Sequence, residues 1–290
     1  MADDPDVFES VLAALALAVL LLAVAAVGWW VARRPASVQG WVVRQADRPK
    51  VSELRQRYRR QFAFLARRLS PGGAFGLSLT VGLIVIVAAG WAFGTLVENV
   101  IERDDLAEHD SPVTAWLAAH RIGWLTATMR VVTWLGSGWV TIPLVAIGGA
   151  VLARPGRRRW TMYVSLAVIL GTTVLVHSIK FLIARQRPTL AEVLATASGF
   201  AFPSGHSAQA VATYGILAFL VCMHLSRWRH RVAAWTVAVG IILMVGFSRL
   251  YLGVHWLTDV LGGYALAAMW LAVVLTVASV LHQPRGAPAP

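Results

Sequence analysis

Seven long apolar stretches, separated by shorter polar segments, set the pattern of this sequence. A transmembrane helix needs roughly 20 apolar residues to cross the hydrocarbon core of a bilayer, and each stretch approaches or exceeds that length. The stretches cover approximately residues 7–32, 74–97, 125–153, 161–184, 206–225, 232–253 and 255–281. The pattern predicts an all-α fold, a polytopic membrane helix bundle.

The third stretch, residues 125–153, is the least uniform of the seven. It contains four glycines and Pro143. Both residue types are tolerated in membrane helices because neighbouring helices fill the space or satisfy the freed backbone groups, so we still expect one membrane helix there. The segment before it, residues 109–126, predicts a short interfacial helix outside the bilayer.

Charge in the connecting segments predicts how the chain is oriented. Residues 33–68 hold eleven basic side chains, residues 154–159 hold four arginines and residues 227–231 hold three, whereas residues 98–110 are acidic. With seven membrane helices the three basic loops fall on one side, which the positive-inside rule makes the cytoplasmic side. We therefore expect a multi-pass protein of the plasma membrane, with its N-terminus outside and its C-terminus inside.

The amino-acid composition agrees with a membrane protein and argues against several other classes of protein. Hydrophobic residues make up 58% of the 290 residues and charged residues only 14%, whereas about a quarter of a soluble domain is charged. The net charge of +12 does not predict nucleic-acid binding, because the basic residues lie in loops between apolar stretches. The single cysteine, Cys222, rules out an internal disulfide and a cysteine-rich metal cluster.

Residues that carry chemistry gather at the ends of the last four stretches, which the predicted topology places together on the outer side. Lys180 and Arg187 end the fourth stretch, Ser204-Gly205-His206 opens the fifth, Arg249 ends the sixth, and His255 and Asp259 open the seventh. A single cation at such a place commonly extends toward the lipid headgroups. That explanation gives no reason for the serine, glycine, histidines and carboxylate, so the set indicates a functional site.

The basic and small residues of this set suit phosphate binding. Lys180, Arg187 and Arg249 supply positive charge and hydrogen-bond donors for a phosphoryl group. Gly205 lets a phosphate approach the free N–H groups of a helix start, and Ser204 adds a hydroxyl donor.

The two histidines and the carboxylate suit phosphoryl transfer. His255 and Asp259 are four residues apart, which predicts a shared helix face. There the carboxylate can hold one imidazole nitrogen and leave the other free to attack. His206 is then available to protonate the leaving oxygen.

Three motifs in this region resemble the type 2 phosphatidic acid phosphatase (PAP2) superfamily. They are Lys-x6-Arg-Pro, Pro-Ser-Gly-His and Ser-Arg-x5-His-x3-Asp, complete and in this order. The resemblance covers about residues 74–281, and residues 110–117 and 133–136 also look like the family. It implies a six-helix PAP2-like catalytic core over residues 74–282. We expect one extra N-terminal transmembrane helix with an arginine-rich cytoplasmic loop before it, at residues 1–73, and a disordered tail after it, at residues 283–290.

The resemblance also implies a role for each site residue. His255 forms a phosphohistidine, Asp259 orients it, and His206 acts as general acid. The phosphate is bound by Lys180, Arg187, Ser204, Gly205 and Arg249. Neither a metal nor another cofactor is implied, and Asp259 is the only acidic residue in or beside the motifs, too few for a two-metal phosphatase.

The implied activity is that of a membrane lipid phosphatase, whose partners are a phosphorylated lipid and the bilayer. Phosphatidic acid, phosphatidylglycerol phosphate and polyprenyl diphosphates all stay open as substrates. Two alternatives are a lipid phosphotransferase, in which another acceptor replaces water, and a non-catalytic phospholipid-binding or transport protein. The histidines and Asp259 argue against the second, because binding alone does not need them. Residues 53–69 fit either a surface helix that binds anionic lipid or a plain solvated helix.

Overall fold

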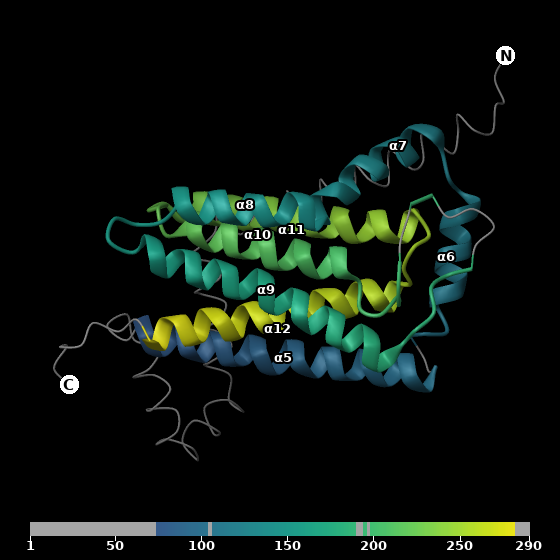
Figure 1. Cartoon of the computed structure of the whole chain (residues 1–290), viewed down its shortest axis with the longest axis horizontal. Coiled ribbons are helices and arrows are strands. Elements are labelled where there is room, and N and C mark those ends of the chain that lie inside the picture. The colour runs from purple at the N-terminus through teal and green to yellow at the C-terminus, as the bar shows by residue number, and fades with distance from the viewer. Residues whose placement is uncertain (1–73, 104–105, 190–193, 196–197, 282–290) are drawn as a thin grey trace, which may run out of the picture.

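The computed structural model describes residues 74–103, 106–189, 194–195 and 198–281 of the chain. Within these ranges the chain forms eight α-helices, one short 3₁₀ helix and no strand (Figure 1). The elements are α5 (Ala74–Glu102), α6 (Asp110–Ala119), α7 (Gly123–Val132), η2 (Thr133–Gly136), α8 (Gly138–Val151), α9 (Arg158–Ile183), α10 (Gly205–Cys222), α11 (Trp228–Tyr251) and α12 (Leu257–Leu281). The all-α prediction is confirmed. The expected helix at residues 7–32, the arginine-rich loop with its residues 53–69, and the tail at 283–290 lie outside the described residues.

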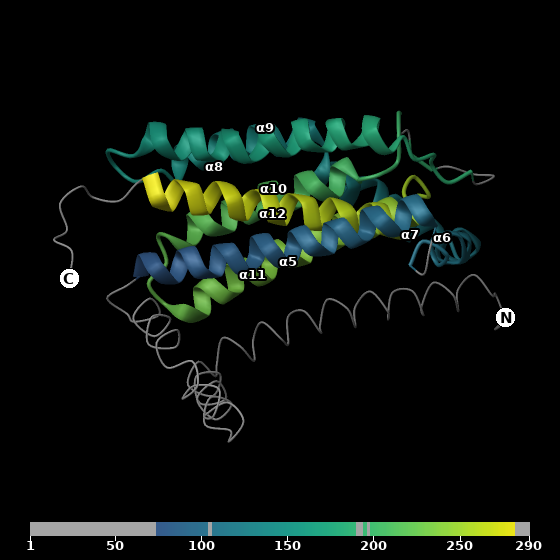
Figure 2. The ribbon, with the colours of Figure 1, turned by 90° about the horizontal axis from the view of Figure 1, so that it is seen from below.

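Five helices of the described part are long and apolar enough to cross a membrane: α5 from Leu79 onward, α9, α10, α11 and α12. They run side by side as one bundle (Figures 1 and 2). Burial singles out α10 as the central helix, because 61% of its most apolar window is buried, against 22% or less for the other four. The outer helices instead expose large apolar side chains, as a lipid-facing surface requires.

The third apolar stretch is not the single straight helix that its composition predicts. It is broken into α7 with η2 and then α8, and the two pieces are bent by 50°. Ser137 between them is extended, with φ −76° and ψ 148°. The break lets η2 pack closely on the start of α10, since a Cβ added to Gly136 would lie only 2.8 Å from the backbone oxygen of His206. The pieces make a sixth membrane span only when counted together.

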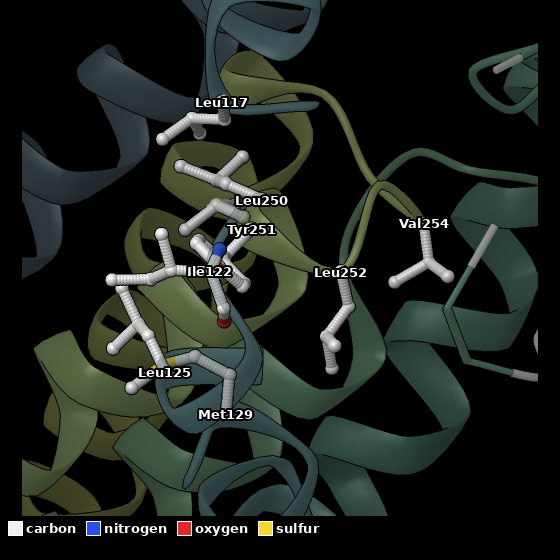
Figure 3. Close-up of a cluster of buried hydrophobic side chains, with 9 residues drawn as sticks. Leu117, Ile122, Leu125, Met129, Leu250, Tyr251, Leu252 and Val254 are labelled. Atoms are coloured by element: carbon white, nitrogen blue, oxygen red, sulfur yellow. Dashed lines mark hydrogen bonds between the residues drawn. The ribbon is translucent and has the colours of Figure 1, made fainter. Parts of the chain in front are cut away.

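The predicted interfacial helix at residues 109–126 is also two helices, because α6 ends at Ala119 and α7 begins at Gly123. A buried cluster joins α6 and α7 to the end of α11 and the loop after it (Figure 3). Its side chains are Leu117, Ile122, Leu125, Met129, Leu250, Tyr251, Leu252, Val254 and Val260. The Tyr251 hydroxyl also accepts a hydrogen bond of 2.9 Å from the Ile122 N–H. The cluster thereby fixes the connection from α11 to α12.

The two ends of the bundle differ in character. One end carries α6, the last turns of α9 and α11, and the first turns of α10 and α12 (Figures 1 and 2). The α8–α9 and α10–α11 connections and the first turns of α9 and α11, which together carry the arginines of residues 154–159 and 227–231, lie at the opposite end. The topology thus separates the chemistry-bearing motifs from both of these basic loops.

Candidate active site

His255 lies in the loop between α11 and α12, at the end of the bundle that carries the motifs. Its Nδ1 is 3.2 Å from Oδ2 of Asp259, and its Nε2 is 3.3 Å from Nη1 of Arg187. Only 2% of His255 and none of Asp259 is exposed. The imidazole is therefore held at one nitrogen by a buried carboxylate while its other nitrogen faces a cation.

The expectation that His255 and Asp259 share a helix face is wrong, because α12 begins only at Leu257. The pair forms in another way. Asp259 stands in the first turn of α12 and accepts the Trp256 N–H at 2.9 Å through Oδ2, the same oxygen that meets His255. This local bond folds the loop back over the helix start, so the histidine reaches the carboxylate without being helical itself.

Lys180 and Arg187 are gathered around the chain segment that leads into α10. The Lys180 ammonium donates to the carbonyls of Phe200 and, at 3.1 Å, Ala201. The Arg187 guanidinium donates to the carbonyl of Gly199 at 2.8 Å and to that of Phe200 at 3.3 Å. Both cations are thus anchored by backbone oxygens beside the start of α10.

The start of α10 is capped by a serine side chain. The buried Ser204 is the N-cap, and its hydroxyl accepts from the Ser207 N–H at 3.4 Å. The Ser204 N–H donates to the Asp259 carbonyl at 2.9 Å, which fixes this helix start to α12. A Cβ at Gly205 would meet only Val176, at an ordinary 3.7 Å. Packing within the protein therefore does not explain the glycine, and the space beside it is available to a ligand.

Arg249 and His206 complete the set. Arg249, only 3% exposed, donates from Nη1 to the Thr133 hydroxyl at 2.6 Å, while its Nε has no partner in the described part of the chain. His206, in the first turn of α10, is within electrostatic range of Lys180, Arg187, Arg249 and His255. All eight residues predicted for the site therefore meet at one end of the bundle.

Burial and charge act together on His255. Loss of solvation lowers the pKa of the imidazole well below its ordinary value of 6.5, and the cations Arg249, Arg187 and Lys180 lower it further. Neutral imidazole is consequently the stable form at neutral pH. With Nδ1–H donated to Asp259, the lone pair on Nε2 is free for a bond to an electrophile.

Two charged residues that the sequence did not single out join this site. Arg185 donates to Oδ1 of Asp259 at 2.7 Å and to Oδ2 of Asp110 at 2.6 Å. Asp110, the first residue of α6, is only 2% exposed, so Asp259 is not the only carboxylate beside the motifs. Arg185 stands two residues before a motif arginine, a weak signal, and Asp110 lies 75 residues away from it.

A cavity of about 720 Å³ opens beside this ion-pair network. It lies between the ends of α5 and α9 and the start of α6, and its wall includes Arg103, Asp110, Arg185, Arg187 and Trp256. Arg185 also stacks over the Trp256 ring, 5.7 Å from its centroid.

A buried imidazole that faces converging cations at the end of a membrane-helix bundle is typical of a membrane phosphatase. Comparison with known proteins agrees. Residues 160–282 match the family model of the PAP2 superfamily. Phosphatidylglycerophosphatase B of Bacillus subtilis (strain 168) is 34% identical over 184 residues, which are 63% of this chain and 89% of that protein.

A solved structure gives the same relationship. The crystal structure of the transmembrane PAP2-type phosphatidylglycerolphosphate phosphatase from Bacillus subtilis matches with a TM-score of 0.63 and 31% identity. The match covers 69% of this chain and 98% of that chain. The structure of Aquifex aeolicus LpxE matches with a TM-score of 0.46 and 24% identity over 57% of this chain and 94% of that chain. This chain belongs to the PAP2 superfamily and is a membrane lipid phosphatase.

Proposed function

We propose that this phosphatase removes the terminal phosphate of phosphatidylglycerol phosphate, or of a closely similar lipid phosphomonoester, through a phosphohistidine at His255. The observation that carries the mechanism is the imidazole itself, which is held at Nδ1 by Asp259 and faces Arg187 with Nε2. The substrate class is favoured by the activity for which the Bacillus subtilis relatives are named, and this chain matches them over most of their length.

The phosphate is bound among Lys180, Arg187 and Arg249, with the N–H groups at the start of α10 and the Ser204 hydroxyl as further donors. Arg187 Nη1, now 3.3 Å from Nε2 of His255, turns its donor to a phosphate oxygen. The unpartnered Nε of Arg249 gains an acceptor in the same way. Charge neutralisation and positioning supply most of the catalysis of phosphoryl transfer, and these residues supply both.

In the first step Nε2 of His255 attacks phosphorus, a P–N bond forms and the P–O bond to the lipid alcohol breaks. His206 donates a proton to that leaving oxygen, and Asp259 stabilises the positive imidazole ring. In the second step water attacks the phosphohistidine, its proton passes to His206, and inorganic phosphate leaves. The cycle consumes one water and restores both histidines, with no metal or other cofactor in any step.

The site takes its lipid from the outer leaflet. The chemistry-bearing residues lie at one end of the bundle, and the arginines of residues 154–159 and 227–231 lie at the other. Basic loops stay on the cytoplasmic side, so the site faces outward in the plasma membrane. Its residues stand at helix ends, near headgroup depth, where a lipid phosphate reaches them while its acyl chains stay in the bilayer.

The full-length protein, purified and assayed in mixed micelles containing excess chelator, tests the proposal. Phosphate release from phosphatidylglycerol phosphate should exceed release from phosphatidic acid and from polyprenyl diphosphate. His255→Gln should abolish release and incorporation of labelled phosphate into protein. His230→Gln, at the exposed opposite end of α11, should match the wild type.

Four results would contradict the proposal. Turnover by His255→Gln would exclude the nucleophile. Loss of activity in chelator, restored by magnesium, would show a need for metal. Phosphate transfer to a lipid acceptor in preference to water would favour a phosphotransferase, and binding of the lipids without turnover would favour a carrier.

A further inference from the structure

A continuous chain of charged contacts connects α6 to the histidine. It runs from Asp110 to Arg185 at 2.6 Å, from Arg185 to Asp259 at 2.7 Å, and from Asp259 to His255 at 3.2 Å. The side chain of Arg185 is 16% exposed, and those of the other three are at most 3% exposed. Ion pairs this deeply buried are geometrically demanding, since each charge must be fully paired to offset its lost solvation.

Arg185 settles the orientation of the Asp259 carboxylate. Oδ2 receives the Trp256 N–H and faces Nδ1 of His255, and Oδ1 receives Nη1 of Arg185. Removing Arg185 leaves Oδ1 as a buried acceptor without that donor, which is costly. The carboxylate then gains by turning toward other donors, and the oxygen that holds the imidazole turns with it.

Asp110 holds Arg185 in turn. Its Oδ2 accepts from Arg185 and, at 2.5 Å, from the Thr258 hydroxyl, and its Oδ1 accepts from the Thr258 N–H at 2.9 Å. The Thr258 hydroxyl lies 2.6 Å from Nη1 of Arg185. One carboxylate on α6 therefore fixes both the guanidinium and the residue directly before Asp259.

We propose that Arg185 and Asp110 are positioning residues of the phosphatase reaction, which hold Asp259 in the orientation that presents Nε2 of His255 to phosphorus. The inference rests on the proposed phosphohistidine mechanism. Arg185 differs in function from Arg187 two residues later. Arg187 reaches Nε2 on the phosphate side of the ring, whereas the Arg185 side chain pairs with the two carboxylates, bonds Thr258 and lies over Trp256.

The same contacts could serve only to stabilise the packing of α6 on α12. The test therefore needs kinetic measurements that a change in stability alone would not alter. Arg185→Ala should lower kcat by about 10- to 100-fold, the scale found for outer partners that orient a histidine. The KM for phosphatidylglycerol phosphate should stay close to the wild-type value, because Arg185 does not face the phosphate. Arg187→Ala should instead raise KM.

Chemical rescue provides the second readout. The cavity of about 720 Å³ has Arg185 in its wall, so truncation to alanine leaves space that free guanidinium can enter. Millimolar guanidinium should restore part of the kcat of Arg185→Ala, because its planar donors reproduce the fork that pairs with carboxylates. Sodium chloride at equal ionic strength should not. Arg103→Gln, in the same cavity wall, is the matched control and should behave as the wild type.

Milder variants keep the test decisive if Arg185→Ala does not fold. Arg185→Lys supplies the charge without the fork and should lose part of kcat while KM is kept. Asp110→Asn should lose less, because Arg185 still reaches Asp259. A wild-type kcat for Arg185→Lys overturns the inference, as does a loss in Arg185→Ala that guanidinium leaves unchanged. Failure of the proposed function would be recognised by a different result, namely turnover by His255→Gln.

Discussion

The imidazole of His255 has a hydrogen-bond acceptor, Asp259, at one nitrogen and a hydrogen-bond donor, Arg187, at the other. Asp259 lies against Nδ1 and Arg187 lies against Nε2. In the proposed mechanism these groups are therefore in place before the substrate arrives. Such preorganisation is what makes electrostatic stabilisation effective, since no groups need to reorient as charge develops.

At the residue scale, the cations around His255 predict a pH effect. Burial, and then the charges of Arg249, Arg187 and Lys180, lower the pKa of His255 below 6.5, so the wild type keeps neutral imidazole at pH values where free histidine is protonated. Arg187→Gln removes one of these charges and raises the pKa. As pH falls, the variant should therefore lose kcat/KM at a higher pH than the wild type does.

The measurement is kcat/KM for one substrate from about pH 4 to pH 8, a range that brackets an ordinary histidine. The substrate's own phosphate titrates identically with both enzymes, so it cancels in the comparison. Arg130→Gln, on α7 and exposed, serves as control. Acid limbs that coincide in the wild type and Arg187→Gln would show that Arg187 has no influence on the titrating group.

The eight site residues were predicted from the types and spacing of the motif residues, and the structure brings them together at one end of the bundle, while their roles stay predictions. The sequence marked residues 110–117 and 133–136 only as resembling the family. It did not predict that Asp110 contacts Arg185 across 75 residues or that Thr133 contacts Arg249, because no local pattern records such contacts.

At the scale of elements, the contact between the first turns of α10 and α12 sets the site. A Cβ at Gly263 would lie 2.6 Å from the backbone oxygen of Ser204 and 3.2 Å from the Ala208 nitrogen. Backbone atoms of a helix start cannot move aside cheaply. The glycine therefore allows α12, with Asp259, to lie directly on the phosphate-binding end of α10.

Gly263→Ala should separate these two helix starts. We expect a cost of about 1–3 kcal/mol in the free energy of unfolding, as for other overpacked sites, with a lower melting temperature in detergent and a reduced kcat. Gly240→Ala on α11 is the control, because a Cβ there meets nothing within 4 Å. If Gly263→Ala had the melting temperature and turnover of the wild type, the first turns of α10 and α12 would have space for a Cβ, which would contradict this prediction.

Helix existence was easier to predict than helix shape. Hydropathy located α5, α9, α10, α11 and α12, because the length and apolarity of each are local properties. It missed the 50° bend before α8, since the bend leaves the composition of the window unchanged and depends on where η2 meets α10. The start of α12 was misplaced by two residues for a similar reason, as Asp259 turns the preceding loop inward.

For the whole molecule, the proposed orientation predicts a labelling pattern in intact cells after Cys222→Ala. Ser198→Cys, exposed beside the start of α10, should react with a membrane-impermeant thiol reagent. Arg158→Cys, exposed at the opposite end of α9, should react only after the cells are permeabilised. The reverse pattern would place the site in the cytoplasm and would exclude an outer-leaflet substrate.

The shortness of α8 has a consequence for the membrane around the enzyme. Its 14 residues rise only about 21 Å at 1.5 Å per residue, against a hydrocarbon core of about 30 Å. Trp139, Ile142 and Ile147 on this helix are exposed, and the chain bends by 50° between α8 and the preceding α7 and η2. We therefore expect lipid beside α8 to thin toward the length of this helix. Headgroups on this flank would then approach η2 and its Thr133, which contacts Arg249, and shorten the distance that a lipid phosphate has to travel.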